Sequence, residues 1–128
     1  MSHFSLIKIS IRNPVVSLLK RAVEEVAREV GAEIVHQVQD YYGRARGDII
    51  IGLRNSVFHR GVGLILTPDG VQLVGDFYNI PASEVERLKR MIMQAYTALA
   101  ISDCLALLGY SVSAQKVQDK IYITGVSP

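Results

Sequence analysis

The sequence predicts an α+β fold, a two-layer sandwich in which a mainly antiparallel sheet is covered by two helices. Short apolar or alternating segments predict strands, and most of them are joined by short turns, which favours antiparallel pairing. Residues 15–30 carry an apolar stripe on one side, and residues 83–108 are apolar over most of their length. Such helices have to be covered by a sheet or by each other, which predicts the layered arrangement, with each helix as a crossover in a ferredoxin-like fold.

Length and composition indicate one globular domain spanning residues 1–128. Hydrophobic residues make up 49% of the chain and charged residues 20%, which argues against a disordered chain. The formal net charge of +2 does not by itself indicate a nucleic-acid partner. Cys104 is the only cysteine, and residues 1–10 lack the apolar core of a signal peptide, so we expect a cytoplasmic protein that is not inserted in a membrane.

Turn and capping residues divide the chain into its predicted elements. The first strand is expected at residues 4–11, and Asn13 and Pro14 have the residue types of a helix N-cap and a first helical position. Gly31 is typical of the residue that ends a helix, and residues 67–70 have the Pro and Gly of a tight turn. Further strands are predicted at residues 32–39, 48–53, 62–66, 71–77, 110–116 and 120–124.

The helix at residues 83–108 is expected to be the centre of the fold. Ser83 and Glu86 have the spacing of a capping box, and Gly109 suits the left-handed conformation that follows a helix. The residues expected to be buried against the sheet and the first helix are Ile92, Ala95, Leu99, Leu105 and Leu108.

The apolar half of this helix contains one charged residue and the only cysteine. A buried aspartate has to be paired or neutral, and the residues one helical turn from Asp103 are apolar, so we expect its partner on a facing element. Cys104 has no neighbouring base in the sequence and is expected to be a small buried hydrophobic residue.

Four segments carry a family resemblance, namely MSHFSLIKISI, YYGRARGDIII, VGLILTPDGVQLVGDFY and QAYTALAISDCLALLGYSV. They resemble a family of unknown function that includes a hypothetical chloroplast reading frame (number thirty-five in its naming series) of red algae and cyanobacteria. The resemblance covers nearly the whole chain. It implies a small soluble domain with no established activity. Because members of that family are reported near genes for AAA-type ATPases, it also implies an AAA-type ATPase as a partner.

The common catalytic and cofactor motifs do not occur in the sequence. It has no P-loop, no Gly-x-Gly-x-x-Gly, no Cys-x-x-Cys, no His-Glu-x-x-His and no Gly-x-Ser-x-Gly. The histidines, His3, His36 and His59, do not have the spacing of metal ligands. We therefore predict neither a cofactor nor a metal site.

Two predicted loops combine basic and aromatic residues. The first contains Tyr41, Tyr42, Arg44 and Arg46, and the second contains Arg54, His59 and Arg60. Aromatic rings next to guanidinium groups can bind phosphates or stack on bases, although a solvated hairpin loop has the same composition. If both loops lie at one end of the sheet, they form a positive patch.

Asp76 lies near the end of a predicted strand and has three plausible roles. It could act as a general base, pair with Arg44 or Arg46, or cap a loop. As a general base it would need His3 and Tyr78 within hydrogen-bonding distance in the same cleft.

These observations support three hypotheses about function. The first is a non-catalytic protein–protein interaction module with the ATPase as its partner. The alternatives are a nucleic-acid or phosphate-ligand binder that uses the basic loops, and an enzyme with a site around Asp76. Residues 48–53 and 121–124 are expected at sheet edges, where unpaired backbone groups favour a homodimer.

Overall fold

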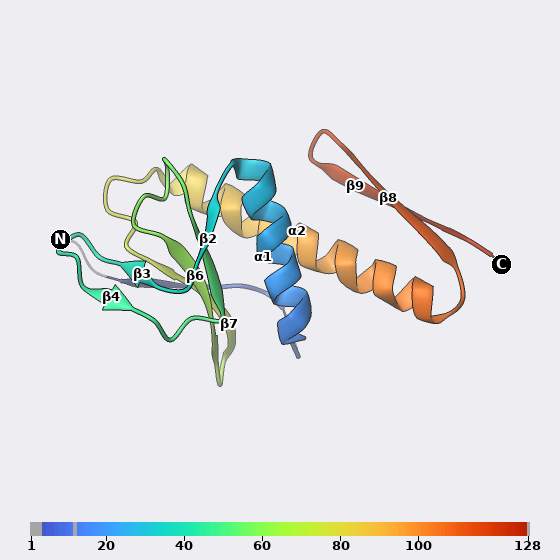
Figure 1. The fold of residues 1–128 in the computed structure, drawn as a ribbon, viewed down its shortest axis with the longest axis horizontal. Coiled ribbons are helices and arrows are strands. Elements are labelled where there is room, and N and C mark those ends of the chain that lie inside the picture. The colour runs from blue at the N-terminus through green and yellow to red at the C-terminus, as the bar shows by residue number, and fades with distance from the viewer. Residues whose placement is uncertain (1–3, 12, 128) are drawn as a thin grey trace.

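The structure is a computed structural model that describes residues 4–11 and 13–127. It has the α+β fold that the sequence predicts, with two helices and a mainly antiparallel sheet (Figure 1). The elements in chain order are β1 (Ser5–Lys8), α1 (Val16–Val30), β2 (Glu33–Val35), β3 (Val38–Gln39), β4 (Ala45–Arg46), β5 (Ile51–Arg54), β6 (Val62–Thr67), β7 (Gly70–Gly75), α2 (Ala82–Leu107), β8 (Ser111–Val117) and β9 (Lys120–Val126).

The main sheet has five strands in the order β1-β7-β6-β5-β2, and each neighbouring pair is antiparallel. β6 and β7 form the predicted hairpin, with Val62 opposite Gly75 and Thr67 opposite Gly70. The segment containing α1 connects the two edge strands, β1 and β2. α2 leads instead to β8, which pairs with β9 in a separate sheet. The expectation that each helix forms a crossover within one sheet is therefore wrong for α2.

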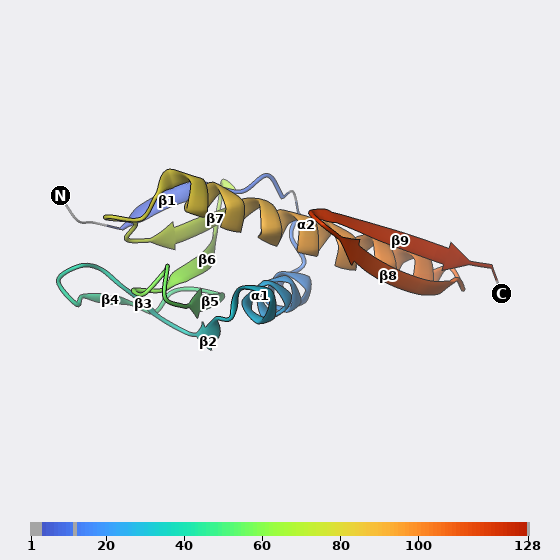
Figure 2. The same ribbon diagram turned by 90° about the horizontal axis from the view of Figure 1, so that it is seen from above.

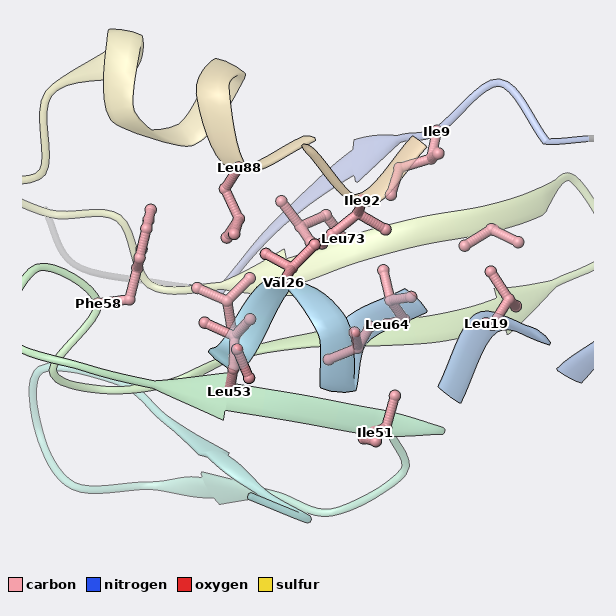
Figure 3. Packing of buried hydrophobic residues seen from close by; sticks show 14 of the residues in the cluster. Ile9, Leu19, Val26, Ile51, Leu53, Phe58, Leu64, Leu73, Leu88 and Ile92 are labelled. Carbon is pink, nitrogen blue, oxygen red and sulfur yellow. The ribbon is translucent and has the colours of Figure 1, made fainter. Parts of the chain in front are cut away.

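One hydrophobic core lies between the main sheet and the two helices, and its side chains meet in Figure 3. The amphipathic stripe of α1 faces the sheet, and Figure 2 shows this helix beside β2 and β5. Burying an aliphatic side chain of this size contributes about 1.5–3 kcal/mol, so this layer accounts for much of the stability of the fold. The core includes Leu19, Val23 and Val26 of α1, Val85, Leu88 and Ile92 of α2, and Leu53, Leu64 and Leu73 of the sheet.

A second, smaller cluster packs Val38, Ile65 and Val74 together, with Ile49 and Phe4 against it. Ile65 and Val74 neighbour core residues Leu64 and Leu73 along their strands, and successive side chains of a strand point to opposite faces. This cluster therefore lies on the face of the sheet away from the helices.

Both helices begin differently from the prediction. α1 has Val15 as its N-cap, and Asn13 has a left-handed φ of 46°, so Asn13 and Pro14 precede the helix and do not cap it. α2 starts at Ala82 after Pro81, and no side chain caps it, so the expected capping box of Ser83 and Glu86 does not form. The helix ends agree with the prediction, because Gly31 (φ 65°) and Gly109 (φ 90°) both adopt the left-handed conformation.

Two strand predictions also need correction. The segment 32–39 is divided between β2 of the main sheet and β3, which pairs with β4. β5 begins at Ile51, and it lies between β6 and β2, so it is an internal strand and not an edge. The expected edge at 121–124 is correct, since β8 is the one strand of the described residues that pairs with β9.

Beyond Tyr96, α2 is not part of the core. Ile92 is fully buried as expected, but Ala95, Leu99 and Leu105 are only partly buried and Leu108 is 68% exposed. Cys104 is exposed rather than buried. Asp103 does pair with a facing element, through Arg21 of α1 at 2.9 Å, but its side chain is 47% exposed.

The second half of α2 and the β8–β9 hairpin extend beyond the main sheet in Figure 1. We refer to residues 98–126 as the C-terminal arm. The hairpin lies against α2, where the Gln94 side-chain amide donates to the carbonyl oxygen of Asp119 at 2.6 Å. Lys116 also pairs with Glu29 of α1. Neither helix of the described residues combines the length and the apolar character that crossing a membrane requires.

Candidate functional site

Three exposed tyrosines and two arginines meet in what we call the tyrosine–arginine cluster. The ring of Tyr41 makes edge-to-face contacts with Tyr42 and Tyr78, with ring centroids 5.3 and 5.8 Å apart. The guanidinium carbon of Arg60 lies 5.1 Å from the centroid of the Tyr41 ring, and that of Arg44 lies 5.6 Å from the centroid of the Tyr42 ring. All four contacts are in the range of favourable aromatic and cation–π interactions.

The topology of the sheet brings these residues to one end of the molecule. Val62 opposes Gly75, so the loop before β6 and the segment after β7 leave the sheet at the same end. The backbone N–H of Gln39, the last residue of β3, donates to the carbonyl oxygen of Arg60 at 2.9 Å, which joins β3 to the β5–β6 loop. The two predicted basic loops therefore do lie together.

Asp40 organises the turn that carries Tyr42 and Arg44. Its side chain is buried, and Oδ1 accepts hydrogen bonds from the backbone N–H groups of Tyr42 and Arg44, each at 2.9 Å. Oδ2 accepts from Nε of Arg44 at 2.5 Å. Burial raises the pKa of the Asp40 carboxyl, but the hydrogen bonds from Arg44 and Tyr42 more than offset this, so the pKa is lower than usual. Gly43 supplies the left-handed residue, with φ of 78°, that the turn requires.

Asp76 joins the other two tyrosines. This buried carboxylate accepts from the backbone N–H of Tyr41 through Oδ2 at 2.7 Å and from that of Tyr78 through Oδ1 at 3.1 Å. Arg60 places Nη1 4.0 Å from Oδ1 and donates to the carbonyl oxygen of Tyr78 at 3.3 Å. Arg44, one of the two arginines considered as partners of Asp76, pairs with Asp40 instead, and among the described residues Arg60 is the cation beside Asp76.

Each arginine of the basic loops lies beside a carboxylate. Besides the pairs already described, Nε and Nη2 of Arg46 donate to the two oxygens of Asp48 at 2.6 and 3.0 Å, so Arg46 does not pair with Asp76 either. This contact raises the pKa of Arg46 and lowers that of Asp48. Nε of Arg54 donates to Glu33 at 2.7 Å. The loops meet at one end of the sheet, as a positive patch would require, but their cationic charge is locally balanced.

The candidate residues chosen from the sequence have different outcomes. Tyr42, Arg44, Asp76 and Tyr78 come together, whereas Arg46 takes part in none of the aromatic contacts found among the described residues. His3 lies outside the described residues. Within residues 4–11 and 13–127, no three His, Cys, Asp or Glu side chains converge in a way that could hold a metal ion.

Sequence reasoning missed Asp40 as a site residue. It named Tyr41 in the first basic loop and Arg60 in the second, but it did not connect either residue with Asp76. One local signal was available for Asp40, because an aspartate followed closely by glycine favours a turn in which the side chain accepts from the backbone two residues ahead. The contact between Asp76 and Tyr41 spans 35 residues, and no local pattern encodes it.

Comparison of the chain with protein-family models, curated proteins and solved structures finds no match in any of the three.

Proposed function

We propose that the chain is a non-catalytic interaction module that binds another protein through the tyrosine–arginine cluster. The observation that carries this proposal is the exposure of three tyrosine side chains, 55% for Tyr41, 66% for Tyr42 and 44% for Tyr78, on backbone that buried aspartates hold in place. Tyrosine and arginine are enriched among the residues that dominate protein–protein binding energies. A surface that is already ordered loses less conformational entropy when a partner binds.

The balanced charge of the loops favours a protein partner over a phosphate ligand. A binding site for nucleic acid needs cations that are available to replace phosphate counterions. Here Arg44, Arg46 and Arg54 donate to carboxylates, which a phosphate would have to displace. We therefore expect no binding of a fluorescent single-stranded oligonucleotide at low ionic strength. Binding that weakens steeply with added salt would support the nucleic-acid alternative instead.

The enzymatic alternative around Asp76 receives less support from the geometry. Both carboxylate oxygens accept backbone N–H groups, which is the arrangement of a residue that fixes a loop. This alternative stays a prediction.

The partner we propose is the AAA-type ATPase that the family resemblance implies. Affinity capture from cells that express the chain naturally should recover such an ATPase with the wild-type protein. Tyr42→Ala should lose it, because that substitution removes the most exposed ring of the cluster. The matched control is Leu66→Ala, which removes a 50% exposed apolar side chain from β6 and should leave the capture unchanged.

Two results would contradict this proposal. If capture recovers no protein specific to the wild-type bait, the chain is not an interaction module. Capture of a specific protein that binds Tyr42→Ala and wild type equally would keep an interaction module but exclude the tyrosine–arginine cluster as its surface.

A further inference from the structure

The C-terminal arm consists of regular structure that the rest of the chain does not bury. The structure describes all of residues 98–126, and none of them is fully buried. Yet 17 of these 29 residues are hydrophobic. The most exposed of the large ones are Leu107 (88%), Leu108 (68%), Val126 (59%) and Tyr122 (54%). Large exposed apolar side chains gathered on one segment are typical of an interaction site.

The chain exposes more surface than a compact monomer of its mass, and the excess is close to the area that one partner contributes to an interface. The chain exposes 7685 Å². A compact monomer of 14.1 kDa is expected to expose about 6,700 Å². The excess of roughly 1,000 Å² is close to the ~800 Å² that each partner contributes to a stable interface of standard size.

The arm is also incomplete as a structural unit. A two-stranded hairpin is marginally stable until a helix or further strands cover it, and here α2 covers only one of its faces. On the other face, Tyr122, Thr124 and Val126 of β9 are exposed. β8 and β9 each have an outer edge without a paired strand among the described residues, and neither strand contains proline to block pairing.

We propose that a second copy of this chain covers the C-terminal arm and forms a two-fold symmetric dimer. In such a dimer the same surface meets itself, so a surface with net charge would repel its copy. The arm contains only four charged residues, and they sum to zero. They are Asp103, Lys116, Asp119 and Lys120. This neutral, apolar surface with open strand edges can therefore meet its own copy without charge repulsion.

This dimer is independent of the proposed function. The tyrosine–arginine cluster lies by β3 and β4 at one end of the molecule, and β8 and β9 lie at the other end (Figure 1). Dimerisation through the arm leaves the cluster exposed, so Tyr42→Ala should not change the dimer.

Light scattering after size exclusion tests the proposal on the full chain. The wild-type protein at micromolar concentration should have twice the 14.1 kDa mass of one chain. Leu108→Glu should reduce this to one chain, because it introduces a charge into the interface at a position that is exposed in the monomer. The matched control is Leu66→Glu on β6, where the leucine is 50% exposed, and this variant should remain dimeric.

A second variant keeps the test decisive if Leu108→Glu loses the helical signal in circular dichroism. Tyr122→Glu changes the outer face of the hairpin without altering α2 and should also give single chains. A wild-type protein with the mass of one chain would overturn the proposal. The proposal would also be overturned if Leu108→Glu and Tyr122→Glu were both folded and both remained dimeric. Another surface would then form the dimer.

Discussion

Replacing Asp76 tests whether this buried carboxylate holds the tyrosine–arginine cluster together. Asp76→Ala removes the acceptors of two backbone N–H groups, those of Tyr41 at 2.7 Å and Tyr78 at 3.1 Å. It also removes the negative charge 4.0 Å from Arg60. The substitution therefore affects both segments that carry these tyrosines.

The expected loss of stability can be worked out from these contacts. A hydrogen bond to a charged group contributes about 1.5–3 kcal/mol, so two of them give about 3–6 kcal/mol. Part of this loss is offset, because removing the buried charge also removes the cost of its desolvation. We therefore expect Asp76→Ala to lower the free energy of unfolding by about 3 kcal/mol, a large part of a typical total of about 5–15 kcal/mol.

Urea denaturation of the wild type, Asp76→Ala and Asp76→Asn measures this loss. The asparagine variant keeps one carbonyl acceptor and should fall between the other two. Tyrosine fluorescence in native buffer should also change in the alanine variant if the rings lose their fixed positions. A loss below about 1 kcal/mol for Asp76→Ala would show that this carboxylate does not hold the two segments, because ordinary surface substitutions already cost up to about 0.5 kcal/mol.

Three further predictions concern the core, the sheet and the turn at Asp40. Ile92→Ala opens a cavity in the core and should cost about 2–5 kcal/mol in urea denaturation, whereas Leu99→Ala, in the partly buried half of α2, should cost clearly less. Gly52→Ala should cost about 1–3 kcal/mol in the same measurement, because its Cβ would lie 2.7 Å from the carbonyl oxygen of Val62. The pKa of Asp40 is lowered in the folded state, so its stabilising effect is present above the ordinary aspartate value of about 3.9 and is lost as the pH falls below it. Asp40→Asn should reduce this acid-induced decline in the free energy of unfolding.

Each of these predictions has a clear contrary result. Equal losses for Ile92→Ala and Leu99→Ala would show that the second half of α2 belongs to the core after all. An unchanged stability of Gly52→Ala would mean that the sheet tolerates a side chain at this strand pair. An acid transition that is the same with and without the Asp40 carboxyl would mean that its hydrogen bonds do not stabilise the folded state.

The fold was largely predictable because its signals are local. The apolar stripe of α1, the Pro and Gly of the β6–β7 turn, and Gly31 and Gly109 are read over a few neighbouring residues, and each agrees with the structure in kind. The helix starts were not predictable in detail. Asn13 and Ser83 have the residue types of helix caps, but Val15 and Pro81 occupy the N-cap positions.

The candidate site was predictable only in part. Tyr42 and Arg44 are neighbours in the sequence, and their loop was identified from composition alone. Their junction with Asp76 and Arg60 depends on how β6 and β7 leave the sheet, which a one-dimensional pattern does not contain. Leu108 was expected to be buried but is exposed in the chain. An apolar side chain is stabilised by burial, but the sequence does not tell whether its own chain or another molecule buries it.

The most direct test of the central claim, that the tyrosine–arginine cluster binds a protein, is photo-crosslinking from position 42 in living cells. Tyr42 is replaced by a benzophenone-bearing phenylalanine, and Leu66 is replaced in the same way as an exposed control far along β6. We predict a covalent adduct with a different protein from position 42, identified as an AAA-type ATPase by mass spectrometry, and none from position 66. Adducts with nucleic acid, or no adduct specific to position 42, would contradict the claim.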